Sequence, residues 1–152
     1  MAFCAPEMRL IDKWRSLPPA RRRALVPALA TVLLVRLCLP YVPLRMWKRV
    51  VGRVRGRALS AGGARVAAED IAWAVCRASR DVPGATCLTQ ALSAQLLLSR
   101  RGYASLLRIG VTRAPGNQLR AHAWLESNSL IVVGGADVNA YTPLAEPLSA
   151  AL

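Results

Sequence analysis

The chain has 152 residues, of which 54% are hydrophobic, 19% are charged and only 5% are aromatic. A chain of this length suits one domain with a short appended segment, and its Leu, Val and Ala residues are enough to fill a core. The low acidic count argues against a disordered chain. The four cysteines lack the Cys-x-x-Cys spacing of zinc and redox sites, so we expect no metal and no cofactor.

Positive charge is concentrated in the first part of the chain. Residues 1–65 hold 14 Lys/Arg and 2 Asp/Glu, whereas residues 66–152 hold 7 Lys/Arg and 6 Asp/Glu. A basic segment attracts nucleic acid, anionic lipid or acidic peptides. An Arg-rich helix surface exposed to water carries the same charge, and both interpretations stay open.

Two features bear on the location of the protein. The apolar run 24–35 ends at Arg36 and is shorter than the roughly 20 residues that a membrane-spanning helix needs. We predict a half-buried helix there, with a helix lying on a membrane surface as the less favoured alternative. The N-terminus carries acidic residues and no early apolar run, unlike a cleavable signal peptide. We therefore expect a cytoplasmic protein whose cysteines are free thiols.

The first 80 residues predict helices that are interrupted by proline and glycine. The run Ser60-Ala-Gly-Gly63 is the best linker, and it divides a basic helical region, 1–63, from a second domain, 64–152. Helices are expected over 7–17, from Ala20 onward, over 45–59 and over 64–80, the last on the helical spacing of its apolar residues.

The remainder of the chain predicts one helix followed by strands. Thr86 is positioned to cap a helix over 87–100, which Gly102 closes. Apolar and polar residues then alternate, which predicts strands over 106–111, 119–126 and 130–134, with a turn at Asn128-Ser129. Helices followed by an antiparallel sheet make an α+β fold.

Cys87 is the candidate nucleophile because it follows a Pro-Gly turn and opens a predicted helix. Unpaired N–H groups and the positive end of the helix dipole stabilise an anion there, so a thiol ionises more readily to the nucleophilic thiolate. The N–H groups of Cys87 and Leu88 would form the oxyanion hole. The alternative is an ordinary buried cysteine, which is how we interpret Cys38 and Cys76.

His122 is the sole histidine of the chain, so no other imidazole can act as general base. It lies on the predicted strand face that carries Trp124 and Glu126, away from the aliphatic side chains. A cysteine at a helix start and a histidine on a later strand are the pair that nucleophilic catalysis requires. The simpler interpretation is a surface or structural histidine.

A third group should orient the imidazole. If the chain turns at Asn128-Ser129, Asp137 lies diagonally across from His122, and a bulge at Gly134-Gly135 would bring it closer. We therefore choose Asp137, with Asn139 as the fallback. Glu126 shares the face of His122 but lies four residues along the same strand, roughly 13 Å away.

The cysteine and histidine segments together resemble the leader peptidases of lasso-peptide biosynthesis, which are bacterial, transglutaminase-like cysteine proteases. The resemblance covers roughly residues 66–145 and rests on the runs VPGATCLTQAL, residues 82–92, and AHAWLE, residues 121–126. It implies a papain-like core in which a helix bearing Cys87 packs on an antiparallel sheet. It also implies Cys87 as nucleophile, His122 as base and an acidic third residue, and we assign Trp124 to substrate binding.

The resemblance further implies the reaction and its partners. The enzyme would remove the leader from a ribosomally made precursor peptide and free the core N-terminus for a separate ATP-dependent cyclase. A small leader-binding protein would deliver the substrate. The basic segment would dock that protein, the cyclase or a membrane.

Two other functions remain as alternatives. One is acyl transfer by the same Cys/His pair, with an amine in place of water. The other is a nucleic-acid or membrane-surface binding module, which predicts binding with a steep salt dependence and no need for Cys87. No aromatic-interleaved basic motif supports nucleic acid as a partner, so we expect none.

Overall fold

The computed structural model describes residues 19–56, 64–136, 138–144 and 148–149. The chain order is α2 (Pro19–Cys38), α3 (Leu44–Arg53), α4 (Ala64–Ser79), α5 (Cys87–Arg100), β1 (Leu106–Ala114), β2 (Gln118–Ser127), β3 (Leu130–Val133), the short 3-10 helix η2 (Val138–Ala140), β4 (Thr142–Pro143) and β5 (Leu148–Ser149). The predicted helix 7–17 and linker 60–63 lie outside the described residues. The helix predicted over 45–59 ends earlier than expected, at Arg53.

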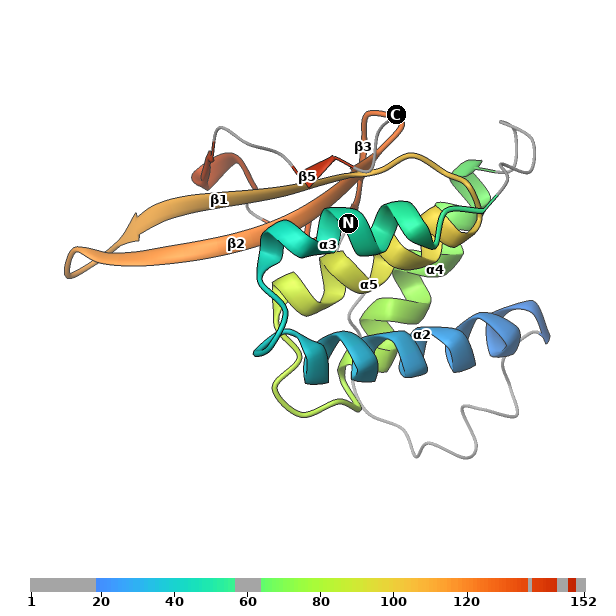
Figure 1. Cartoon of the computed structure of the whole chain (residues 1–152). Coiled ribbons are helices and arrows are strands. Elements are labelled where there is room, and N and C mark those ends of the chain that lie inside the picture. Colours follow the sequence, from blue (N-terminus) through green and yellow to red (C-terminus); the bar gives the residue numbers. More distant parts are fainter. Residues whose placement is uncertain (1–18, 57–63, 137, 145–147, 150–152) are drawn as a thin grey trace.

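Helices and strands form separate layers, and helices α2 to α5 pack together on one side of the sheet (Figure 1). The strand order is β3-β2-β1-β4, with β5 also pairing with β1, and all the pairs are antiparallel. The observed arrangement confirms the predicted α+β class.

Helix α5 is central because it is buried over most of its length and contacts the other helices and β1, β2 and β3. Helix α2 packs on α4 and α5 through Ala28, Val32 and Val35, which are wholly buried. One hydrophobic cluster therefore contains residues from both sides of the predicted division at residue 63. None of the helices in the described ranges combines the length and the apolar content needed to cross a membrane.

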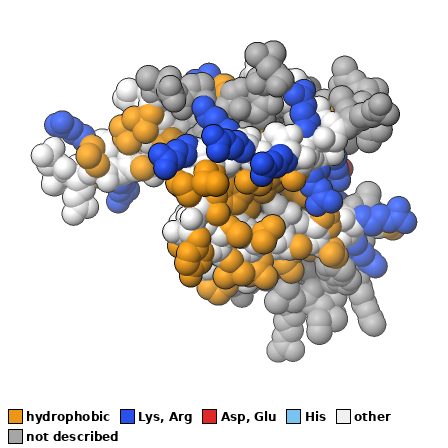
Figure 2. Space-filling view, in the orientation of Figure 1, with side chains coloured by type: hydrophobic (Ala, Val, Ile, Leu, Met, Phe, Trp, Pro, Cys, Tyr) orange, Lys and Arg blue, Asp and Glu red, His pale blue; other side chains and the backbone are white. Residues whose placement is uncertain are grey.

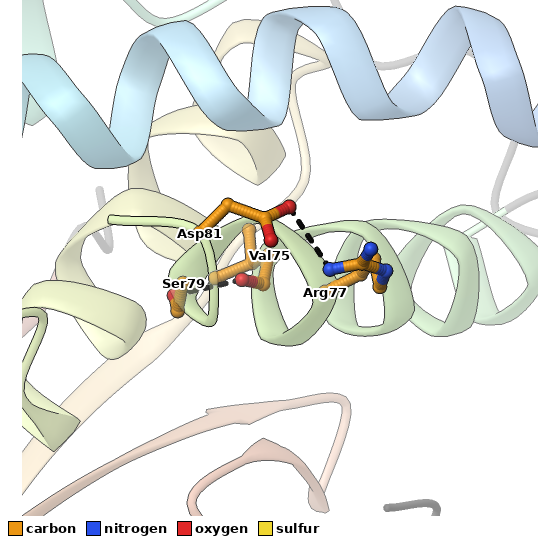
Figure 3. Close-up of polar contacts among 4 residues, drawn as sticks. All are labelled: Val75, Arg77, Ser79 and Asp81. Atoms are coloured by element: carbon orange, nitrogen blue, oxygen red, sulfur yellow. Dashed lines mark hydrogen bonds and ion pairs between the residues drawn. The ribbon is translucent and has the colours of Figure 1, made fainter. Parts of the chain in front are cut away.

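The end of α4 is held by side-chain contacts just before the chain turns toward α5 (Figure 3). Ser79 is buried and its hydroxyl donates to the Val75 carbonyl at 2.8 Å. Arg77 Nη1 donates to Asp81 Oδ2 at 2.9 Å. The ion pair links the last turn of α4 to the first residues of the connection that follows it.

The long hairpin of β1 and β2 is continued by a second, tight hairpin to β3. Asn128 and Ser129 both have positive φ, 50° and 62°, which confirms the predicted turn at these residues. The pairs Leu125↔Val133 and Glu126↔Ile131 differ in register by one residue, so an extra residue is accommodated on β3. This irregularity comes earlier than the bulge expected at Gly134-Gly135.

Strand β2 buries one face against the helices. Ala123 and Leu125 belong to the helix-packed core, as the alternation of residue types predicts. His122, Trp124 and Glu126 therefore point to the opposite side, which we call the outer face of β2. This strand supplies core packing on one side and polar groups on the other.

Candidate functional site

Cys87 is the first residue of α5, and its side chain is half-buried against the hydrophobic core. The helix begins here because Thr86 is extended and its hydroxyl accepts a hydrogen bond from the Thr89 N–H at 3.3 Å. The Thr89 hydroxyl in turn accepts from the Thr86 N–H, which completes a capping box. The predicted helix and its predicted cap are both confirmed.

At the start of α5, two backbone donors have no hydrogen-bond partner in the part of the chain that the structure describes. The cap takes the Thr89 N–H, and the Gln90 N–H donates to the Thr86 carbonyl. Within the described ranges, no backbone or side-chain acceptor is bonded to the N–H groups of Cys87 and Leu88. These are the two groups that the sequence assigns to an oxyanion hole, and a helix N-terminus favours a negative charge near them.

Arg36 lies against the turn that precedes Cys87, a contact for which the sequence offers no local signal. The turn includes Gly84, whose φ is +71°. A Cβ built on Gly84 would lie 2.8 Å from Arg36 Nη2 and 3.0 Å from Nε, so a larger residue would displace the guanidinium, and the positive φ itself favours glycine. Arg36 Nε is itself buried without a hydrogen-bond partner among the described residues. The end of α2 is thereby packed onto the connection that enters α5.

His122 is held by a backbone carbonyl and two rings. Its Nε2 lies 2.8 Å from the Gly134 carbonyl oxygen, and its ring centroid lies 5.1 Å from that of Tyr141 and 6.3 Å from that of Trp124. A carbonyl only accepts hydrogen bonds, so Nε2 carries the proton in this contact. Nδ1 is then the nitrogen whose lone pair is available to a proton.

Trp124 and Glu126 form a polar cluster with Arg108 on the same face. The Trp124 indole donates to Glu126 Oε1 at 3.0 Å, and Arg108 Nε donates to Oε2 at 2.9 Å. Burial disfavours the Glu126 carboxylate, but the hydrogen bonds from Arg108 and Trp124 and the charge of Arg108 outweigh it, so the pKa of Glu126 lies below its usual value. Trp124 is assigned to substrate binding from the sequence, but its side chain is only 3% exposed, so little of it is accessible to a substrate.

The structure does not bring Cys87 and His122 together. Cys87 packs against the core on the helix side of the sheet, whereas His122 lies on the outer face of β2. No hydrogen bond joins the sulfur to the imidazole in the described part of the chain. The expected contact between the two side chains is therefore absent from this arrangement, and their catalytic roles stay a prediction.

The third catalytic position has three candidates in the sequence. Asp137 lies outside the described residues. Asn139 lines an open pocket of about 510 Å³ together with Thr112, Arg120, Gly135 and Tyr141, and this pocket adjoins His122 through Tyr141. Glu126 is bonded to Arg108 and Trp124. Among the described groups, the Gly134 carbonyl is the one that is hydrogen-bonded to the His122 imidazole and can hold its orientation, which is the role expected of a third catalytic residue.

The other described cysteines differ from Cys87 in their surroundings. Cys38, Cys76 and Cys87 are free thiols. Burial raises the pKa of the Cys76 thiol, so Cys76 is protonated at neutral pH and a poor nucleophile. No group of three or more His, Cys, Asp and Glu side chains that would suit a metal ion occurs within the described ranges.

Comparison with known proteins identifies the family. The chain matches no curated protein and no solved structure closely enough to be counted as similar. The family model of the Transglutaminase-like superfamily matches residues 38–146. This match includes α3 to α5 with Cys87, the β1–β2 hairpin with His122, and part of the basic segment, and it spans more than half of the 152 residues. The chain therefore belongs to the Transglutaminase-like superfamily.

Proposed function

We propose that this protein is a cysteine peptidase in which Cys87 is the nucleophile. The superfamily generally comprises cysteine peptidases and transglutaminases, both of which act through an acyl-enzyme. The observation that carries the proposal is the position of Cys87 as the first residue of α5, beside two N–H groups that have no hydrogen-bond partner among the described residues. Cys38 and Cys76 have no comparable position, since both lie inside or at the end of helices.

The start of α5 supplies what the first step needs. The Cys87 thiolate attacks the scissile carbonyl carbon and forms a carbon–sulfur bond, while the N–H groups of Cys87 and Leu88 donate to the oxyanion. Collapse of this intermediate breaks the carbon–nitrogen bond, and the leaving amine takes a proton from the general acid. Water then hydrolyses the thioester, releases the acid and restores the thiol.

His122 is proposed as the acid and base. The Gly134 carbonyl, which accepts from Nε2, takes the place that an orienting side chain has in other catalytic triads. Nδ1 would then exchange the proton with Cys87. A change of rotamer cannot carry a side chain to the other face of its strand, so proton exchange between His122 and Cys87 requires a placement of the β1–β2 hairpin relative to α5 that differs from the one in the structure.

The proposed substrate is the leader segment of a ribosomally made lasso-peptide precursor, cut at the junction with the core. Support comes from the superfamily match and from the paired runs around Cys87 and His122. The open pocket beside Tyr141 and Arg120 is a candidate site for residues of the peptide. A small leader-binding protein and an ATP-dependent cyclase are the proposed partners.

The nucleophile is tested by cleavage of a precursor peptide, measured by mass spectrometry. Cys87→Ala should lower the cleavage rate by about 10³-fold or more, because no other described thiol opens a helix. The matched control is Cys76→Ala, which removes a buried, protonated thiol and should retain activity. Iodoacetamide should alkylate Cys87 before Cys76. Cleavage by Cys87→Ala at the wild-type rate would refute the assignment.

The base is tested separately, because His122 lies on the face of β2 that points away from the helices. His122→Ala should abolish cleavage, and added imidazole should restore part of it, which a purely structural histidine would not allow. If His122→Ala were fully active while Cys87→Ala were inactive, the assignment of Cys87 as nucleophile would stand and the assignment of His122 as base would be wrong. Asp137→Ala and Asn139→Ala in the same assay assign or exclude the remaining candidates for the third role.

Superfamily membership also makes acyl transfer a second candidate. The two reactions share the acyl-enzyme and differ in whether water or an amine resolves it. Incubation of enzyme and precursor with a primary amine separates them. Peptide that carries the amine at its new C-terminus would establish transfer, and free acid alone would establish hydrolysis.

A further inference from the structure

Helix α2 is apolar on both of its sides. Its inner side is buried in the core, and the opposite side carries exposed aliphatic residues. We call that side the α2 outer face; it consists of Val26, Leu29, Leu33, Leu34 and Leu37. A surface helix in water normally carries polar residues there, so an exposed stripe of this kind indicates a surface that is covered in function.

Cations border the α2 outer face, and acidic residues are absent from this part of the chain. Residues 19–56 contain nine Lys/Arg and no Asp/Glu. Figure 2 shows a broad hydrophobic area with Lys and Arg side chains along its upper edge and at one end. The exposed cations of this part of the chain are Arg21 and Arg23 at the start of α2, Arg45, Lys48, Arg49 and Arg53 on α3, and Arg55 just after α3.

The combination of aliphatic residues and cations decides which partner fits. A second copy of the chain would bring its own exposed cations against this face, and residues 19–56 contain no acidic group to meet them. A nucleic acid would satisfy the cations but would leave the Leu and Val side chains in water. A membrane surface with anionic lipids satisfies both, since acyl chains receive the aliphatic side chains and phosphates receive the cations.

We infer that the α2 outer face docks on an anionic membrane surface, with Leu33 and Leu37 against the acyl chains and the cations of α3 against the lipid headgroups. The residues that pack on α4 and α5 lie on the other side of α2. Docking therefore leaves the core undisturbed and keeps the sheet away from the lipid. Since Arg36 packs on the turn before Cys87, the docked helix is also the one that contacts the entry to α5.

The test is co-sedimentation of the purified full-length chain with vesicles. Vesicles of phosphatidylcholine alone are compared with vesicles that also contain phosphatidylglycerol, at low and at raised salt. We expect binding to the anionic vesicles, little binding to the neutral ones, and weaker binding as salt screens the cations. Cys87→Ala should bind as wild type, because docking needs no catalytic group.

Two pairs of variants separate the apolar part from the charged part. Leu33→Gln with Leu37→Gln should reduce partitioning about tenfold. Leu119→Gln is the control for the leucine substitutions and should leave partitioning unchanged, since Leu119 is 73% exposed on the hairpin away from α2. Arg49→Gln with Arg53→Gln should weaken binding more than the pair Arg113→Gln with Arg120→Gln, which removes the same charge from the hairpin. Far-ultraviolet circular dichroism verifies that each variant is folded.

Several results would overturn the inference. One is an absence of binding to anionic vesicles. Another is binding that is lost with the charge pair but unchanged by the leucine pair, which would be electrostatic adsorption without insertion. A dimer that dissociates when Leu33 and Leu37 are replaced would assign the face to a second copy. Capture of an acidic protein partner without vesicle binding would assign it to that partner.

Discussion

The side chains on the two faces of β2 are held by different kinds of interaction. The inner face contributes Ala123 and Leu125 to the core that the helices share. The outer face places His122, Trp124 and Glu126 against a carbonyl, an aromatic ring and a guanidinium. The inner face depends on apolar burial, whereas the outer face depends on a few directional contacts. Substitutions on the two faces should therefore differ in size and in kind.

This comparison also explains why the expected catalytic pair is not assembled. In a strand, neighbouring side chains point to opposite faces. Because Ala123 and Leu125 pack on the helices, His122 is directed away from them, while Cys87 remains on the helix side. Any arrangement that joins the two must change the relation of the hairpin to α5.

The largest effect should come from the inner face. Leu125→Ala removes a wholly buried side chain and should lower the free energy of unfolding by about 2–5 kcal/mol, because the lost contacts leave a cavity. Urea unfolding followed by circular dichroism measures it. Leu130→Ala, at a β3 position that is 51% exposed, is the control and should change stability by less than about 1 kcal/mol. Equal losses at both positions would contradict the assignment of faces.

A medium effect should come from the carbonyl that holds His122. Gly134→Ala should cost about 1–3 kcal/mol, because Gly134 has φ +78° and a Cβ there would lie 2.7 Å from the Ala123 carbonyl oxygen. The matched control is Gly116→Ala, where φ is +83° and nothing lies within 4 Å of the added Cβ.

The same pair of variants reports on the histidine. In wild type the His122 Nε2 proton is hydrogen-bonded to Gly134 and should be protected from exchange with solvent in proton NMR spectra. Gly134→Ala should remove this protection, and Gly116→Ala should keep it. An unchanged signal in Gly134→Ala would show that another group holds the imidazole.

The smallest effect should come from Glu126. Glu126→Gln should cost about 0.2–1 kcal/mol at neutral pH, since the pair with Arg108 is partly exposed. The pKa of Glu126 is lowered in the folded protein, so its contribution is present above the unfolded pKa and is lost as pH falls through the folded pKa. The difference between wild type and variant should therefore vanish in acid. A double-mutant cycle with Arg108→Gln isolates the pair, and a difference that persists at low pH would contradict this account.

The local features of the fold could be predicted because neighbouring residues determine them. Thr86 and Thr89 cap α5 through contacts three residues apart, and Asn128 and Ser129 adopt the positive φ of a tight turn. The alternation along β2 correctly separated His122 from the aliphatic face. Superfamily membership followed from two short runs and was confirmed by the match to residues 38–146.

Contacts between distant residues could not be predicted. Nothing near Gly84 in the sequence indicates that Arg36, from another helix, packs on it. The register shift between β2 and β3 and the bond from His122 to the Gly134 carbonyl depend on how the hairpins pair. The α2 outer face has the same residue types as the inner face, so only packing distinguishes the two.

By itself, the sequence determined the α+β order of elements, the helix start at Cys87 and the strand face of His122, because each depends on short-range periodicity and hydrogen bonding. The tertiary structure decided that Cys87 and His122 lie on different sides of β2 and that one side of α2 stays exposed. The reason is physical: which face of a helix or strand is buried depends on what packs against it, and those partners are far away along the chain.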